Sequence, residues 1–171
     1  MTANAGSPRP FGRHLISLVA VLVGAYVAGT AIWPSEANVL AKLPGPDLSP
    51  AEVVRIQVSA LGQGSDSEAG IAVAFRFASP NNRAWTGPIS HFSSMIRSAN
   101  YSPLLDNVSV QYGRTLTRED RSYTALIVTD RRGVSSAFVW VLSRQASGRC
   151  EDCWMTDTVV PIGDMQSLKF A

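Results

Sequence analysis

The sequence is poor in charge and in cysteine, and it contains no recognisable catalytic motif. Charged residues make up 16% of the 171 residues, and the formal net charge is +2. The chain has no dense basic block of the kind that neutralises nucleic-acid phosphates, so we expect no nucleic-acid partner. Hydrophobic residues make up 46% of the chain, which is enough for one domain with a core of ordinary size.

The scarcity of cysteine also argues against a zinc site. Cys150 and Cys153 have no further cysteine to join them, and His91 is distant from them in the sequence. Glu151 or Asp152 alone would leave the set of ligands incomplete. We therefore expect no metal and no cofactor.

The longest apolar stretch lies near the N-terminus. Residues 15–33 form a run of nineteen without a charged side chain, after a polar flank, residues 1–14, that carries Arg9 and Arg13. As a helix this run can span a bilayer, which predicts a single-pass anchor in the inner (plasma) membrane with its N-terminus in the cytoplasm. A cleaved secretory signal is the alternative. Both predict a periplasmic or extracellular domain, which is membrane-tethered in one case and secreted in the other.

The rest of the chain divides into a linker, a domain and a short tail. Residues 34–47 are rich in proline and suit an extended linker. The domain is expected over residues 48–163, and residues 164–171 form a C-terminal tail. The first helix of the domain begins after Ser49, because Ser49 and Glu52 can form a capping box.

Two further helices are expected on either side of a polar loop. Residues 69–78 form an apolar helix that ends before Pro80, since proline disfavours helical geometry in the residue that precedes it. Residues 79–88 form the loop, which can either bind a ligand or join the helices to the sheet. A third helix follows, capped by residues 86–88. It buries one face, made of Ile89, Phe92, Met95 and Ile96.

The periodicity changes to that of strands after Asp106. Segments 107–112, 122–129, 134–144 and 154–161 are rich in β-branched and aromatic residues. The short connection at residues 130–133 predicts that the second and third strands are antiparallel neighbours. The expected fold is α+β, with about three helices packed on one face of a curved, four-stranded antiparallel sheet. Both faces of the third strand are apolar, so we expect a partner, a loop or a pocket on its second face.

Several sequence strings together resemble an uncharacterised bacterial family, domain of unknown function 4864. They are the segment Ala74–Pro88, the helix start Leu48–Pro50, the segment Leu142–Gln145, and the segment Cys150–Pro161. The resemblance implies a cone-shaped α+β fold similar to nuclear transport factor two-like and ketosteroid-isomerase-like proteins, with a cystatin-like sheet as the alternative. It implies export or membrane anchoring in many members, and it carries no established activity.

Proteins with such cones often hold a ligand between the sheet and the helices. Asn82, Arg83, Tyr112 and Tyr123 are the candidates for ligand binding. Asp157 and His91 are weaker candidates for catalysis, and His91 lies off the apolar face of its helix, where histidines are usually solvated.

Asp157 lies inside an apolar run, where an unpaired carboxylate would be costly, so we expect Arg83 to pair with it. That pair would fix the polar loop to the last strand. Alternatively, Arg83 and Asn82 bind an anionic group.

Cys150 and Cys153 have the spacing of a redox motif. In an exported domain they are expected to form a small structural disulfide before the last strand. A catalytic dithiol normally has its first cysteine at the N-terminus of a helix, whereas this pair is expected in a loop.

Three functions therefore remain open. The favoured interpretation is a non-enzymatic, membrane-tethered domain that binds a small molecule or a protein partner. The alternatives are a small cone-fold enzyme of isomerase or dehydratase type and a thiol–disulfide protein.

Overall fold

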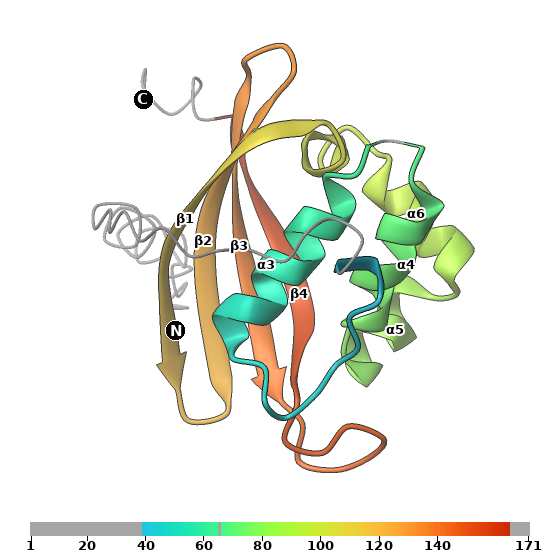
Figure 1. Cartoon of the computed structure of the whole chain (residues 1–171), viewed down its shortest axis with the longest axis vertical. Coiled ribbons are helices and arrows are strands. Elements are labelled where there is room, and N and C mark those ends of the chain that lie inside the picture. The colour runs from blue at the N-terminus through green and yellow to red at the C-terminus, as the bar shows by residue number, and fades with distance from the viewer. Residues whose placement is uncertain (1–38, 65, 165–171) are drawn as a thin grey trace, which may run out of the picture.

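The structure is a computed structural model, and it describes residues 39–64 and 66–164 (Figure 1). Four α-helices precede a four-stranded sheet within these residues, which confirms the expected α+β order with one helix more than expected. The elements are α3 (Pro50–Leu61), α4 (Glu68–Arg76), α5 (Pro80–Thr86), α6 (Ile89–Ile96), the 3₁₀ helix η1 (Ser102–Leu104), β1 (Asn107–Arg118), β2 (Arg121–Asp130), β3 (Ser135–Arg144) and β4 (Trp154–Asp164).

The sheet is an antiparallel meander in the order β1-β2-β3-β4, so the predicted pairing of the second and third strands is confirmed. All four α-helices lie on one side of it (Figure 1). We call this side the inner face; it carries the buried side chains of Leu126, Trp140 and Leu142. Residues alternate along a strand, so Tyr123 and Ser143 lie on the opposite, outer face.

β1 and β2 extend beyond their predicted ends because polar side chains pair across them. The Thr115 and Thr124 hydroxyls lie 2.8 Å apart, and those of Thr117 and Ser122 lie 3.1 Å apart. Such cross-strand pairs stabilise a sheet without the apolar alternation that marks a strand in the sequence.

The capping box at the start of α3 is confirmed. The Glu52 amide donates to Ser49 Oγ at 3.3 Å, and the Ser49 amide donates to Glu52 Oε2 at 2.8 Å. These bonds satisfy amide groups that a helix start leaves without partners. The Ser49 hydroxyl, which donates to Glu52 Oε2 at 2.6 Å, and the Ser49 amide both lower the pKa of the Glu52 carboxyl group.

The predicted loop at residues 79–88 is wrong, because most of it forms helix α5. Ser79 caps this helix by accepting from the Asn82 amide at 3.2 Å, and Pro80 occupies its first turn. Proline is compatible with a helix there, since the amide it lacks would have no partner. Gly87 ends α5 with a φ of 74°. The next helix, α6, has Pro88 as its N-cap, within the predicted cap of residues 86–88, and Pro88 makes no side-chain hydrogen bond there.

A short parallel bridge joins the end of α4 to β4. The Thr156 amide donates to the Phe77 carbonyl, and the Ser79 amide donates to the Thr156 carbonyl, both at 2.9 Å. The segment between α4 and α5 is therefore hydrogen-bonded to the edge of the sheet.

The predicted membrane segment, residues 15–33, and its flank lie outside the described residues, as do residues 165–171 of the tail. None of the helices in the described ranges has the length and apolar character needed to cross a membrane. Part of the predicted linker is described and packs on the domain. Arg76 Nη1 donates to the carbonyls of Leu40 and Lys42, at 3.3 and 2.7 Å.

Candidate functional site

A cavity of about 350 Å³ lies between the helices and the inner face of the sheet, next to β3 and β4. Trp85 of α5 lies at its edge with 90% of its surface exposed. Most of the other side chains that line it are apolar. They include Leu61, Phe92, Met95, Ile96, Leu104 and Val159.

A buried network of neutral hydrogen bonds forms one wall of the cavity. Gln57 Oε1 accepts from Thr156 Oγ1 at 2.6 Å and from Trp140 Nε1 at 3.1 Å. Gln57 Nε2 donates to the Ala74 carbonyl at 2.9 Å. Gln57, Trp140 and Thr156 are at most 4% exposed, so these bonds compensate the loss of hydration of their polar groups.

Three further polar side chains line the cavity nearer to α5 and η1. Asn82 Nδ2 donates to the Thr156 carbonyl at 3.1 Å, and Tyr101 Oη donates to the Val159 carbonyl at 3.0 Å. Thr86 Oγ1 donates to the Asn82 carbonyl at 2.9 Å. Burial raises the pKa of the Tyr101 hydroxyl, so this group stays neutral at physiological pH.

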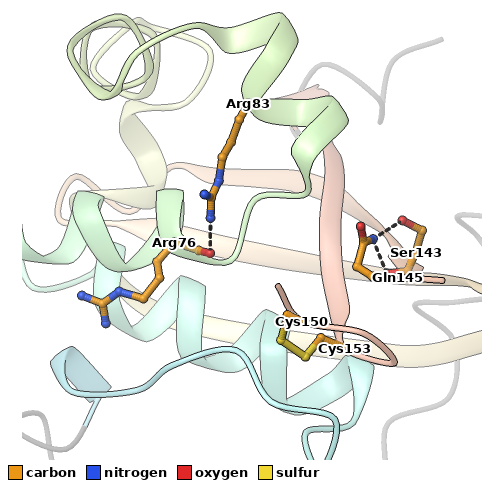
Figure 2. Close-up of a disulfide and its surroundings, with 6 residues drawn as sticks. All are labelled: Arg76, Arg83, Ser143, Gln145, Cys150 and Cys153. Carbon is orange, nitrogen blue, oxygen red and sulfur yellow. Dashed lines mark hydrogen bonds between the residues drawn. A yellow bond between two sulfur atoms is a disulfide. The ribbon is translucent and has the colours of Figure 1, made fainter. Parts of the chain in front are cut away.

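The predicted pairing of Arg83 with Asp157 is wrong. Arg83 Nη2 donates to the Arg76 carbonyl at 2.6 Å, as Figure 2 shows, and its guanidinium lies 5.3 Å from the centroid of the Phe75 ring. Asp157 instead accepts from Arg121 Nη1 at 2.8 Å and from Ser143 Oγ at 2.9 Å.

A register shift in β4 explains why this pairing fails. Thr156 pairs with Leu142 and Thr158 pairs with Val141, so Asp157 is the extra residue of a bulge. Ser143 and Arg121 pair directly across β2 and β3 and share the outer face. The Asp157 carboxylate therefore bonds to outer-face partners, whereas Arg83 lies among the helices of the inner face.

The remaining candidates are dispersed over the molecule. His91 is exposed on α6 and is not among the residues that line the cavity. Tyr123 lies on the outer face. Tyr112 borders a second cavity of about 230 Å³, with the Arg55 guanidinium 4.5 Å from its ring centroid. Burial raises the pKa of Tyr112 to about 12, which the charge of Arg55 partly opposes. Of the four ligand-binding candidates, Asn82 alone lines the larger cavity.

The predicted disulfide between Cys150 and Cys153 is confirmed, and Figure 2 shows it. It lies in the connection between β3 and β4, where the Gln145 amide donates to the Cys153 carbonyl at 2.9 Å and the Asp152 amide donates to the Gln145 carbonyl at 2.8 Å. Cys153 is fully buried. The loop is therefore held by these backbone bonds as well as by the disulfide.

Sequence reasoning missed most of the cavity lining, including Gln57, Trp85, Tyr101 and Thr156. The sequence does carry a signal for Gln57, because Gln57 is a polar residue within the otherwise apolar face of α3. Across the described part of the chain, His, Cys, Asp and Glu side chains do not gather in groups of three that could hold a metal ion.

A family model described as a domain of unknown function (DUF4864) matches residues 49–161. The chain belongs to this family. The matched range starts at the cap of α3 and ends in β4, so every residue that lines the larger cavity lies within the DUF4864 domain. Searches of curated proteins and of solved structures found no match.

Proposed function

We propose that the DUF4864 domain is a binding module that holds a small, largely apolar molecule in the cavity between its helices and β3 and β4. The observation that carries this proposal is the cavity of about 350 Å³ with its mostly apolar lining. Ligand pockets typically measure about 300–1,000 Å³ and combine apolar walls with a few polar groups. Gln57, Asn82 and Tyr101 supply such groups.

Binding is favoured over catalysis because the described residues of the lining offer no suitable general base. Asp157 and Tyr101 are the titratable residues among those described along it. The Asp157 carboxylate is already bonded to Arg121 and Ser143, and the raised pKa of Tyr101 keeps its proton in place. Acid–base catalysis of an isomerase or dehydratase type needs a group that titrates near the working pH.

We also infer that residues 15–33 hold the domain on the outer side of a membrane, and that its fold is a cone of the nuclear transport factor two-like or cystatin-like kind. Helices on one face of the sheet are compatible with such a cone. The disulfide supports an oxidising compartment. Extraction of membranes with alkaline carbonate tests the anchor. The chain should stay in the membrane fraction, whereas release of a shortened chain would favour the cleaved signal.

Equilibrium dialysis of 2-naphthamide tests the binding function. The full chain, in dilute nonionic detergent, should bind the probe saturably, in excess of detergent alone. Ala74→Leu, which enlarges a side chain in the lining, and Thr86→Phe, at α5, should each remove this binding. Circular dichroism verifies that the variants fold. Leu43→Ala is the control, because Leu43 is 65% exposed and outside the lining. Equal uptake by wild type and both variants would contradict the proposal.

A further inference from the structure

The geometry points to an uncharged ligand with an apolar body and one polar end that both donates and accepts hydrogen bonds, such as a primary amide or an alcohol. This inference rests on the proposed function, because it concerns the same cavity. It follows from the charges around the cavity and from the hydrogen-bonding groups that the protein leaves unused there.

An anionic ligand would find no cation in this cavity. No Lys, Arg or His is among the described residues that line it. Arg83 follows Asn82 in the sequence, but its guanidinium donates to the Arg76 carbonyl and lies over Phe75 (Figure 2). Burial of a carboxylate without a counter-charge carries a large desolvation cost. The hypothesis that Arg83 and Asn82 bind an anionic group is therefore not favoured.

A cationic ligand would find no unpaired carboxylate. Asp157 is the one acidic residue among those described along the lining, and Arg121 already neutralises it at 2.8 Å. Its second carboxylate oxygen accepts from Ser143. The interior of the cavity therefore offers hydrogen bonds but no uncompensated charge.

The residues that line the cavity keep several hydrogen-bonding groups unused. Gln57 Oε1 already accepts two hydrogen bonds, which occupy both of its lone pairs, whereas Gln57 Nε2 keeps one hydrogen beside its bond to the Ala74 carbonyl. Asn82 uses one amide hydrogen, and therefore keeps a second hydrogen and its carbonyl oxygen. Thr86 and Tyr101 donate their hydroxyl hydrogens to backbone carbonyls and keep oxygen lone pairs. These groups can thus donate twice, from Gln57 and Asn82, and accept several times.

A primary amide or alcohol matches this set of groups. Its oxygen would accept from the Asn82 amide, and its hydrogen would be donated to Thr86 Oγ1 or Tyr101 Oη. Its apolar body would lie against Leu61, Phe92 and Leu104. Trp85, which is exposed beside Thr86, lies where the polar end would enter.

A matched pair of probes tests the charge preference. 2-Naphthamide and 2-naphthoate share a skeleton and differ in charge at pH 7. Dialysis against the full chain should show the amide binding at least tenfold more tightly than the carboxylate, because only the carboxylate loses its hydration without a counter-charge. Arg83→Gln should leave this ratio unchanged. Equal affinity for both probes, or a loss of naphthoate binding in Arg83→Gln, would overturn the inference while leaving the binding function intact.

Two variants test the polar end. Asn82→Leu and Thr86→Val should each weaken 2-naphthamide binding severalfold, on the order expected for one hydrogen bond, without weakening the binding of naphthalene, which lacks the polar end. Thr86→Val keeps the shape of the side chain, so it still tests the polar end if Asn82→Leu does not fold. An unchanged affinity for the amide in both variants would overturn the assignment of the polar end. Absence of binding for all three probes would instead refute the proposed function.

Discussion

Thr156 and Asp157 are neighbours in β4, and they lie in opposite environments. Thr156 is 2% exposed and belongs to a neutral network with Gln57 and Trp140 on the inner face. Asp157 pairs with Arg121 on the outer face, where their side chains are 17% and 51% exposed. The charged group therefore lies where water reaches it, and the contact that joins helices to sheet is neutral.

This difference predicts which contacts matter for stability. A partly exposed ion pair typically contributes less than about 1 kcal/mol, because water and salt screen it. A buried donor or acceptor that loses its partner costs about 1–3 kcal/mol. The inner network should therefore contribute much more to folding than the outer pair.

The largest effect is expected for Gln57→Leu. This change leaves Trp140 Nε1, Thr156 Oγ1 and the Ala74 carbonyl without partners, and should lower the free energy of unfolding by about 3 kcal/mol or more. Urea denaturation measures it. Gln63→Leu is the matched control, because Gln63 makes one long bond of 3.4 Å in an exposed position and should cost less than about 0.5 kcal/mol. Equal losses would refute the special role of the network.

A smaller effect is expected at alkaline pH from Tyr112, which also lies on the inner face, opposite Leu126. Its folded-state pKa of about 12 lies above the ordinary value of 10, so its stabilising contribution is complete below pH 10 and is lost as the pH rises toward 12. At pH 12 the loss should approach about 2 kcal/mol. Urea denaturation from pH 9 to 12 measures it.

The control for this titration is Tyr112→Phe, which removes the hydroxyl. The difference in unfolding free energy between wild type and variant should change across pH 10–12 and stay constant below pH 9. A difference that does not depend on pH would contradict the partly buried, neutral state of Tyr112.

The smallest effect is expected for Asp157→Asn, which removes the charge and keeps the shape. The free energy of unfolding should fall by less than about 1 kcal/mol, because Arg121 is half exposed. The difference from wild type should shrink further in 1 M salt, where screening is stronger. A loss as large as that of Gln57→Leu would mean that the outer pair, and not the inner network, stabilises the sheet.

Much of the fold follows from local signals in the sequence. The capping box of Ser49 and Glu52 defines the start of α3, and the turn at residues 130–133 defines the central hairpin. Helix α5 was missed because Ser79 and Pro80 favour both a loop and a helix start.

The candidate site was less predictable, because it depends on which face of a strand each residue occupies. The bulge at Asp157 shifts the alternation by one residue, which no local pattern in Trp154–Val160 reveals. The predicted contact between Arg83 and Asp157 rested on their opposite charges, and the bulge prevents it. Gln57 contacts Thr156 because α3 packs across β4. That hydrogen bond joins residues 99 positions apart in the sequence.

The central claim is that the cavity of the inner face binds an uncharged small molecule. The most direct measurement is a titration of the ¹⁵N-labelled full chain with 2-naphthamide, observed through the Asn82 side-chain amide and the indole N–H of Trp85 in two-dimensional NMR spectra. Our account predicts saturable shifts at both groups, which Ala74→Leu abolishes. Saturable shifts confined to outer-face residues such as Tyr123, or no saturable shift at all, would contradict it.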